Sequence, residues 1–489
     1  MPNNSSLKSK AAKGMAWSAF GTFSSQGISF AIGIILARLL MPSDYGMIGM
    51  LAIFFAVSQL LVESGFSNAL IQKIDRTEDD YSTIFYVNLL VSIIIYLILF
   101  ITAPFIAHFY NTPELTLITR VLSLNILIGS FAIVQQARLK ILLDFKTPAL
   151  ITILSVAVSG AIGIVMAIYG YGVWALVIQS ICATIVRTIF LFIFNRWLPK
   201  LVFSISSLKQ LFRFSSNLLV AGLVATIMNN LYSILIGKLF SPKDVGFYTR
   251  ARQFPELLSG TITSILQGVT YPILTSLQND RDRMVSVYGR LMRITVFFVM
   301  PLLTLFALLA EPFIRLLLTE KWMPVVPLIQ WLCFARMITP ISGLNMNILN
   351  AIGRSDLFLK VDLSKFPLAL VTMAITVPFG INAVVIGNFF ITIIGFFINA
   401  YYPGKLFGFG AVRQVKEMLT VIVATLIMAI FVFGITNLIP GDFLKLIAGT
   451  IIGITTYLLS AHFMKIEELK EVRTMTIQMR GKFISSNRN

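Results

Sequence analysis

Long apolar segments alternate with short polar segments along the whole chain. Each apolar segment holds about 20 residues or more, the length that a helix needs to cross the hydrocarbon core of a membrane. We therefore predict about fourteen membrane-crossing helices, near residues 14–37, 46–70, 82–107, 115–136, 148–168, 173–194, 211–237, 247–274, 291–311, 324–350, 361–379, 381–400, 415–435 and 443–463. The polar segments are short throughout. The pattern predicts an all-α polytopic membrane protein without an inserted soluble domain.

A sequence repeat organises these helices. Residues 38–46 (RLLMPSDYG) return as residues 238–246 (KLFSPKDVG), each copy following one apolar segment and opening the next. Pro42 cannot continue the incoming helix, and a side-chain oxygen of Asp44 can cap the next one; the second copy keeps both residues. A chain built from two copies of a helical bundle is the plan of many transporters.

Further echoes extend the repeat. Arg120 and Arg138 correspond to Arg336 and Arg354 at an offset of 216, and residues 172–177 resemble residues 380–385 at an offset of 208. We therefore predict two pseudo-symmetric six-helix lobes followed by two additional helices and a tail. Their predicted ranges are 1–205 for the N-terminal lobe, 206–410 for the C-terminal lobe, 411–463 for the two helices and 464–489 for a cytoplasmic tail.

The distribution of basic residues predicts the orientation. Two of the 39 lysines and arginines, Arg187 and Arg336, lie inside predicted helices. Nine fall on the side predicted to be external: Arg38, Arg120, Lys238, Lys243, Arg250, Arg252, Arg315, Lys321 and Lys445. The others fall on the opposite side with both termini, which the positive-inside rule assigns to the cytoplasm. The net charge of +18 is thus a signal of topology, and nucleic acid is not needed as a partner.

Composition offers little for catalysis. Charged residues make up 12% of the chain, against roughly 25% in soluble domains, and there are only two histidines and two cysteines. No phosphate-binding loop, zinc-protease motif or metal-ligand cluster is present. The acidic run 78–80 shares a short segment with Lys73 and Arg76, so we expect a solvated loop there rather than the active site of a glycosyltransferase or ligase. We expect no enzyme activity, no catalytic residue, no metal and no cofactor.

Several motifs in a characteristic order resemble the polysaccharide transporter family. They are KGMAWS at 13–18, ARLLMPSDYG at 37–46, ESGF at 63–66, ALIQ at 69–72, QARL at 136–139, GYGVWAL at 170–176 and GFY at 246–248. This family contains O-antigen and exopolysaccharide flippases, in a superfamily with lipid II flippases and multidrug exporters. The resemblance covers residues from about 10 to about 410.

The resemblance implies a function and a place. The cargo would be an undecaprenyl-diphosphate-linked oligosaccharide, moved across the bacterial inner membrane through a cavity that opens alternately to each side. Partners would be this lipid-linked oligosaccharide, membrane lipids and a glycan polymerase or another glycan-assembly protein. A cation-coupled small-molecule exporter of the same superfamily is the main alternative.

Charged residues within the predicted helices are the candidate site. A charge in the bilayer centre is costly and usually faces a cavity, and guanidinium groups suit a diphosphate because they donate paired hydrogen bonds. The substrate-binding candidates are Arg336, Arg250, Arg252, Arg38, Arg120 and Arg187. Glu63 and Glu256 could couple transport to protons or sodium, with the membrane potential as another possible drive; alternatively, Glu256 simply pairs with Arg252 one turn earlier.

Overall fold

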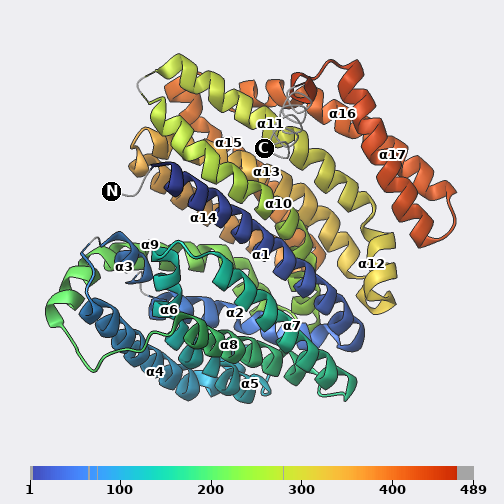
Figure 1. Cartoon of the computed structure of the whole chain (residues 1–489). Coiled ribbons are helices and arrows are strands. Elements are labelled where there is room, and N and C mark those ends of the chain that lie inside the picture. The colour runs from blue at the N-terminus through green and yellow to red at the C-terminus, as the bar shows by residue number, and fades with distance from the viewer. Residues whose placement is uncertain (1–3, 64–65, 74, 279, 471–489) are drawn as a thin grey trace, which may run out of the picture. The chain divides into compact units, whose positions relative to one another are not determined.

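The computed structural model describes residues 4–63, 66–73, 75–278 and 280–470. Every regular element in these ranges is helical (Figure 1), which confirms the predicted all-α fold. The described chain forms two compact units, Met1–Thr249 and Arg250–Asn489, called unit 1 and unit 2 below. The predicted lobe boundary near residue 205 stays a prediction from the repeat.

Unit 1 holds nine complete helices and the start of a tenth. They are α1 (Asn4–Leu39), α2 (Pro42–Glu63), α3 (Phe66–Gln72), α4 (Glu78–Phe109), α5 (Leu115–Leu122), α6 (Leu124–Ile141), α7 (Lys146–Ile168), α8 (Val173–Asn195), α9 (Ile205–Leu239) and the first turns of α10 (Pro242–Ser276). Helix α1 packs along α7 with little space between the backbones. A Cβ atom on Gly21 would lie 2.4 Å from the Cβ atom of Ala149, and one on Gly160 would lie 2.0 Å from Ile32. Small residues permit this close approach of helices within a membrane.

Unit 2 repeats much of this arrangement. It continues with α11 (Arg281–Leu308), α12 (Ala310–Leu318), the short helix η1 (Glu320–Trp322), α13 (Val325–Ala351), α14 (Ser355–Thr376), η2 (Val377–Phe379), α15 (Ile381–Phe407), α16 (Ala411–Leu438) and α17 (Asp442–Phe463). Within unit 1, α6 packs on α4 and α8, and α7 packs on α8; within unit 2, α13 packs on α11 and α15, and α14 packs on α15. Matching helix pairs in matching order support the repeat.

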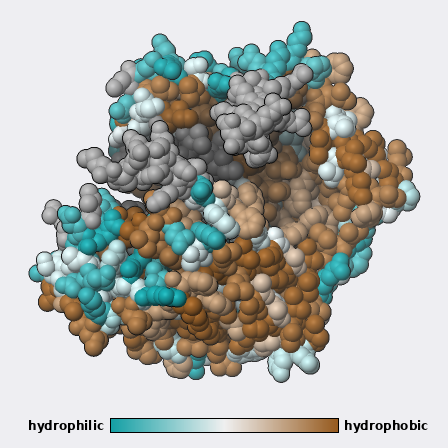
Figure 2. All heavy atoms as spheres, in the orientation of Figure 1, coloured by the Kyte–Doolittle hydropathy of each residue, from teal (hydrophilic) through white to brown (hydrophobic). Residues whose placement is uncertain are grey.

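Eleven helices among the described residues are long and apolar enough to cross a membrane. Helices α9, α10 and α14 correspond to three of the fourteen predicted crossings but fall outside this set, so the count of fourteen stays a prediction. Large apolar side chains dominate the surface in Figure 2. On α16 and α17, for example, Ile430, Leu438 and Phe463 are each more than 70% exposed. Such a surface belongs in lipid rather than in water.

The repeated turn has the same local chemistry in both copies. Helix α2 begins at Pro42 and α10 begins at Pro242, four and five residues before the predicted starts at 46 and 247. The side-chain Oδ2 atom of Asp44 accepts a hydrogen bond from the Met41 backbone amide at 2.8 Å, and Asp244 accepts one from Ser241 at 3.3 Å. Each aspartate therefore caps from inside the first helical turn, by bonding back to the residue before the proline.

The two copies of this turn also touch each other within unit 1. A Cβ atom on Gly46 would lie 1.6 Å from the Pro242 carbonyl oxygen, and one on Gly246 would lie 1.8 Å from the Pro42 carbonyl oxygen. The contact is reciprocal, as expected for two elements related by a pseudo-twofold axis. Only glycine allows the starts of α2 and α10 to approach so closely.

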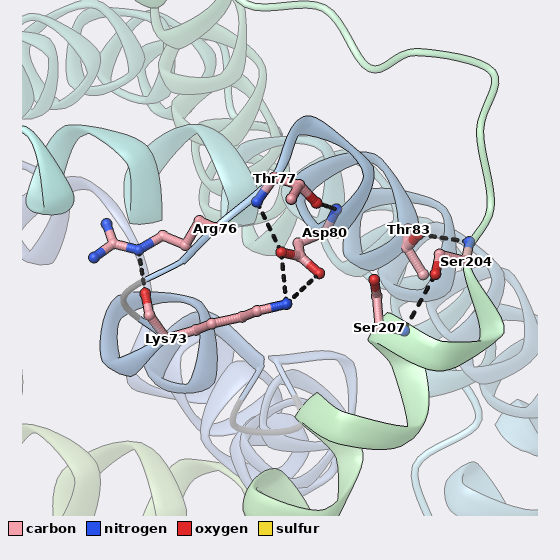
Figure 3. A network of polar contacts seen from close by, with 7 residues as sticks. All are labelled: Lys73, Arg76, Thr77, Asp80, Thr83, Ser204 and Ser207. Carbon is pink, nitrogen blue, oxygen red and sulfur yellow. Dashed lines mark hydrogen bonds and ion pairs between the residues drawn. The ribbon is translucent and has the colours of Figure 1, made fainter.

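The acidic run 78–80 is not a solvated loop, and this expectation was wrong. It forms the first turn of α4, and Asp80 is fully buried. Both carboxylate oxygens of Asp80 bind the Lys73 ammonium at 2.8 Å, and Oδ2 accepts a hydrogen bond from the Thr77 amide at 2.8 Å. Figure 3 shows this cluster beside Thr83, which accepts a hydrogen bond from the Ser204 amide and so ties the segment before α9 to α4. A carboxylate with its partners filled in this way stabilises a helix terminus.

Candidate functional site: a polar cavity in unit 1 and an arginine cluster in unit 2

A polar cavity of about 420 Å³ lies among the apolar helices of unit 1. Its walls come from α2, α3, α5, α6 and α8. The side chains that line it are Ile48, Ala52, Phe55, Gln59, Glu63, Ser67, Leu122, Asn125, Ile126, Gly129, Ala132, Ile133, Gln136, Lys140, Ser180, Thr184, Arg187 and Thr188. Hydroxyl, amide and charged groups in such a place have no role in packing against lipid.

Helix periodicity places one face of α2 along this cavity. The lining residues of α2 recur every three or four positions from Ile48 to Glu63. At 1.5 Å per residue this face is about 22 Å long, a large part of the thickness of a bilayer. Its first half is apolar and its last turns carry Gln59 and Glu63, so the polarity of the wall rises toward the predicted cytoplasmic end.

Hydrogen bonds arrange the polar groups in two levels. Nearer the start of α6, the Asn125 amide donates to the Ser180 hydroxyl at 3.0 Å. Three turns further on, Nη2 of Arg187 donates to Oε1 of Gln136 at 2.8 Å. Glu63 accepts a hydrogen bond from Gln59 at 2.8 Å across one turn of α2. Two of the predicted residues, Arg187 and Glu63, thus face one cavity, where Arg187 offers further N–H donors and Glu63 offers a further acceptor oxygen to a ligand.

A second polar cluster forms in unit 2 around Glu256. Its Oε1 atom accepts hydrogen bonds from Nε of Arg252 and from Nη2 of Arg336, each at 2.6 Å. The pairing of Glu256 with Arg252, which the sequence left as an alternative to ion coupling, is present. All three side chains are partly exposed, by 22–38%. Among the residues that the structure describes, Nε of Arg336 has no hydrogen-bond partner, so the cluster retains a guanidinium donor.

The other predicted arginines occupy separate places. Arg250 is buried in unit 2 and donates to Gln253 at 2.5 Å. Arg38 is exposed in the last turn of α1. Arg120 donates to the Phe100 carbonyl oxygen at 3.2 Å and lies 4.5 Å over the Phe100 ring. Neither Arg38 nor Arg120 lines the unit 1 cavity.

Arg138 and Arg354, which correspond to each other in the repeat, each contact residues close to them in the structure. Arg138 lies over the rings of Tyr81 and Trp197, at 5.3 and 5.1 Å. Arg354 donates to both carboxylate oxygens of Asp356, at 2.8 and 2.7 Å. These charge-assisted hydrogen bonds lower the pKa of Asp356 to about 2. Arg138 and Arg354 therefore occupy equivalent positions of the repeat, but they contact different kinds of partner.

The amide residues of the cavity were not predicted from the sequence. Gln136 lies in a quoted motif, yet only the structure shows it bound to Arg187, and Asn125 was not selected at all. In unit 2 a fully buried set of Tyr288, Asn345 and Gln414 links α11, α13 and α16. Polar residues with no charge inside apolar segments were the available signal, since each must find a partner there.

Eleven candidate membrane spans in the described ranges, several of them around a polar cavity, define a multi-pass membrane protein. The model of the polysaccharide biosynthesis protein family matches residues 35–327, and the chain belongs to this family. The resemblance noted in the sequence is thereby confirmed.

Three relatives illustrate the family. The chain is 24% identical to the succinoglycan biosynthesis transport protein ExoT of Rhizobium meliloti over 331 residues, which cover 68% of this chain and 67% of ExoT. It is 28% identical to the teichuronic acid biosynthesis protein TuaB of Bacillus subtilis over 305 residues, covering 61% and 62%. It is 22% identical to the lipopolysaccharide biosynthesis protein WzxC of Escherichia coli over 366 residues, covering 74% of each chain.

Solved structures share the fold. The lipid II flippase MurJ, in an inward closed conformation, aligns with a TM-score of 0.74 and 17% identity over 92% of this chain and 98% of MurJ. An inward-facing multidrug resistance transporter of the MATE family aligns with a TM-score of 0.60 and 19% identity, covering 78% and 95%. The likeness to these two structures shows the fold, and the family match supports a transport protein rather than an enzyme.

Proposed function

We propose that this protein is a flippase that moves an undecaprenyl-diphosphate-linked oligosaccharide across the bacterial inner membrane by alternating access. The observation that carries the proposal is the unit 1 cavity, where a guanidinium, a carboxylate, amides and hydroxyls line a space among apolar helices. The family match and the MurJ-like fold support lipid-linked cargo in general.

The cavity suits such a headgroup chemically. Sugar hydroxyls exchange hydrogen bonds with amides and hydroxyls such as Asn125, Gln136 and Ser180, while Arg187 can offset part of the diphosphate charge. The lipid tail needs no polar path, because it can remain in the bilayer while the headgroup crosses. In unit 2, Arg336 and Arg252 offer two further guanidinium groups that share the single carboxylate of Glu256.

Energy coupling has two candidate carboxylates. Glu63 is exposed to the cavity and, within the described ranges, accepts a side-chain hydrogen bond from Gln59 alone. It is therefore better placed to exchange a proton or hold sodium than Glu256, which two arginines neutralise. The membrane potential is the third possible drive. Both termini are proposed to be cytoplasmic, from the positive-inside rule.

A small-molecule exporter is the alternative, and the fold shared with a MATE transporter favours it. A cavity that binds cationic drugs needs an excess of carboxylates. The unit 1 cavity instead has Lys140 and Arg187 against the single carboxylate of Glu63, which favours an anionic cargo.

The test is gene deletion followed by complementation. We expect the deletion to remove surface glycan and to accumulate complete lipid-linked repeat units in the cytoplasmic leaflet. The Arg187→Ala variant should reach the membrane in normal amounts, yet it should fail to restore surface glycan and fail to clear the accumulated repeat units. Arg315→Ala is the matched control, because Arg315 contacts Glu311, Glu320 and Asp442 and does not line the cavity. Unfinished repeat units would indicate a transferase, and normal glycan with altered drug sensitivity would indicate the exporter.

A further inference from the structure

A second pocket, of about 340 Å³, lies wholly within unit 2, where α15 ends and α11 and α16 begin. It shares no residue with the unit 1 cavity or with the Arg336 cluster. Three arginines, Arg281, Arg293 and Arg413, line it together with Asp282, Glu417 and Ser286. We call it the α11–α16 pocket.

Two guanidinium groups in this pocket are positioned by aromatic rings. Arg281 lies 5.5 Å from the centre of the Phe407 ring, and Arg413 lies 5.0 Å from the centre of the Phe409 ring. Cation–π contacts of this kind hold a guanidinium in place without using its N–H donors. In the described ranges no carboxylate lies within ion-pair distance of Arg281, and Arg413 has only Glu417 at 3.6 Å, beyond ordinary hydrogen-bond range.

Two nearby glutamates form ion pairs with Arg293, the third arginine of the pocket. Arg293 binds Glu417 at 2.5 Å and Glu468, from the segment after α17, at 2.8 Å. Glu468 is 5% exposed, so its charge is directed inward to Arg293. Asp282, the remaining acidic residue of the lining, is exposed in the first turn of α11. The donors of Arg281 and Arg413 are therefore available to an anion from outside the chain.

The surroundings indicate a membrane lipid as the source of that anion. Helices α11, α15 and α16 are all candidate membrane spans, and the pocket lies at the ends that the charge distribution assigns to the cytoplasm. Figures 1 and 2 show hydrophilic atoms along the upper edge of unit 2, where α11 and α16 begin. Next to the pocket residue Arg413 and further along α16, apolar side chains are exposed, with Val412 at 69% and Leu419 at 53%. A phosphate in the pocket would leave its acyl chains beside this apolar face.

We propose that the α11–α16 pocket binds the phosphate of an anionic membrane lipid, with Arg281 and Arg413 as its two ligands. Basic pockets between helices at the cytoplasmic side of a membrane are suited to anionic headgroups, and each basic residue strengthens such binding about fivefold. This site is separate from any cargo path. It holds whether or not the protein flips an oligosaccharide.

The experiment titrates purified full-length protein in detergent micelles with phosphatidylglycerol and follows the midpoint of thermal unfolding. We expect phosphatidylglycerol, and not phosphatidylcholine, to raise the midpoint. Arg281→Ala combined with Arg413→Ala should raise the lipid concentration for half-maximal effect about thirtyfold. Arg283→Ala is the matched control, because Arg283 is exposed on the same turn of α11 and does not line the pocket.

A second variant keeps the test decisive if the double variant does not fold. Ser286→Glu leaves both arginines in place and adds a negative charge to the pocket wall, so it should also weaken the lipid effect. An equal response in wild type, the double variant and Ser286→Glu would overturn the proposal. So would an equal loss in Arg283→Ala, or the same midpoint shift with inorganic phosphate alone, which would assign the site to free phosphate.

Discussion

The glycine contact between the starts of α2 and α10 makes a quantitative prediction. A Cβ atom on Gly246 would lie 1.8 Å from the Pro42 carbonyl oxygen, whereas ordinary van der Waals contact begins near 3.4 Å. Gly246→Ala therefore requires the two helix starts to separate by about 1.6 Å. The obstacle is backbone, so no side chain can rotate to make room.

Two opposing contributions determine how far Gly246→Ala changes the free energy of unfolding. Overpacking of this kind costs typically about 1–3 kcal/mol, and alanine regains up to about 1 kcal/mol over glycine in a helix interior. We expect Gly246→Ala to destabilise the protein by about 1–2 kcal/mol. Gly46→Ala should do the same, because its Cβ atom would meet the Pro242 carbonyl oxygen at 1.6 Å.

The reciprocal geometry predicts that the two substitutions are not additive. Once one alanine has separated the helices, most of the space for the second is already present, so the double variant should cost much less than the sum. The assay is equilibrium unfolding of all four proteins in mixed micelles. Gly260→Ala, later on α10, is the control; nothing described lies within 4 Å of its added Cβ atom, and it should be neutral or stabilising. Additive costs, or a neutral Gly246→Ala, would refute the reasoning.

Three other substitutions test separate features. Arg336→Ala should abolish glycan export with a normal amount of protein in the membrane, because Glu256 keeps its second arginine; wild-type export on cell-surface staining would remove Arg336 from the mechanism. Asn345→Leu should destabilise unit 2 by about 1–3 kcal/mol, since it removes the donor to the buried Gln414 side-chain oxygen and the acceptor of the Tyr288 hydroxyl, and an unchanged unfolding midpoint would contradict this. Gly380→Ala should cost about 1–3 kcal/mol in the same assay, because φ of 90° with ψ of 175° is a conformation that only glycine adopts readily.

Much of the fold could be predicted because the membrane simplifies the problem. Helices are the only structure available to an apolar segment of this length, so the predicted segments are helical, although 46–70 is divided between α2 and α3 and 115–136 between α5 and α6. The repeat was readable because its turn depends on local chemistry, a proline at the first position and an aspartate two residues later. Gly172 and Gly380, paired at an offset of 208, both have positive φ just before a helix.

The site could be predicted only in part, because it depends on contacts between distant segments. Glu63 and Arg187 were selected by their charge, but their common cavity follows from the packing of α2 against α6 and α8. Asp80 was misjudged for the same reason. A cluster of charges near a helix start resembles a solvated loop until the distant segment that covers it, here the segment leading into α9, is in place.

The pairing of Arg293 with Glu468 has a consequence for biogenesis. These two residues are separated by 175 positions, and the second partner, Glu417, also follows Arg293 by 124. At 5–20 residues per second, ribosomes take roughly 9–35 s to reach Glu468 after making Arg293. Helix α11, which carries Arg293, is therefore made before either of its two carboxylate partners exists. The pair with Glu417 can form once α16 is in place, whereas the pair with Glu468 forms only after α17 has been made, so this last contact completes the packing around Arg293.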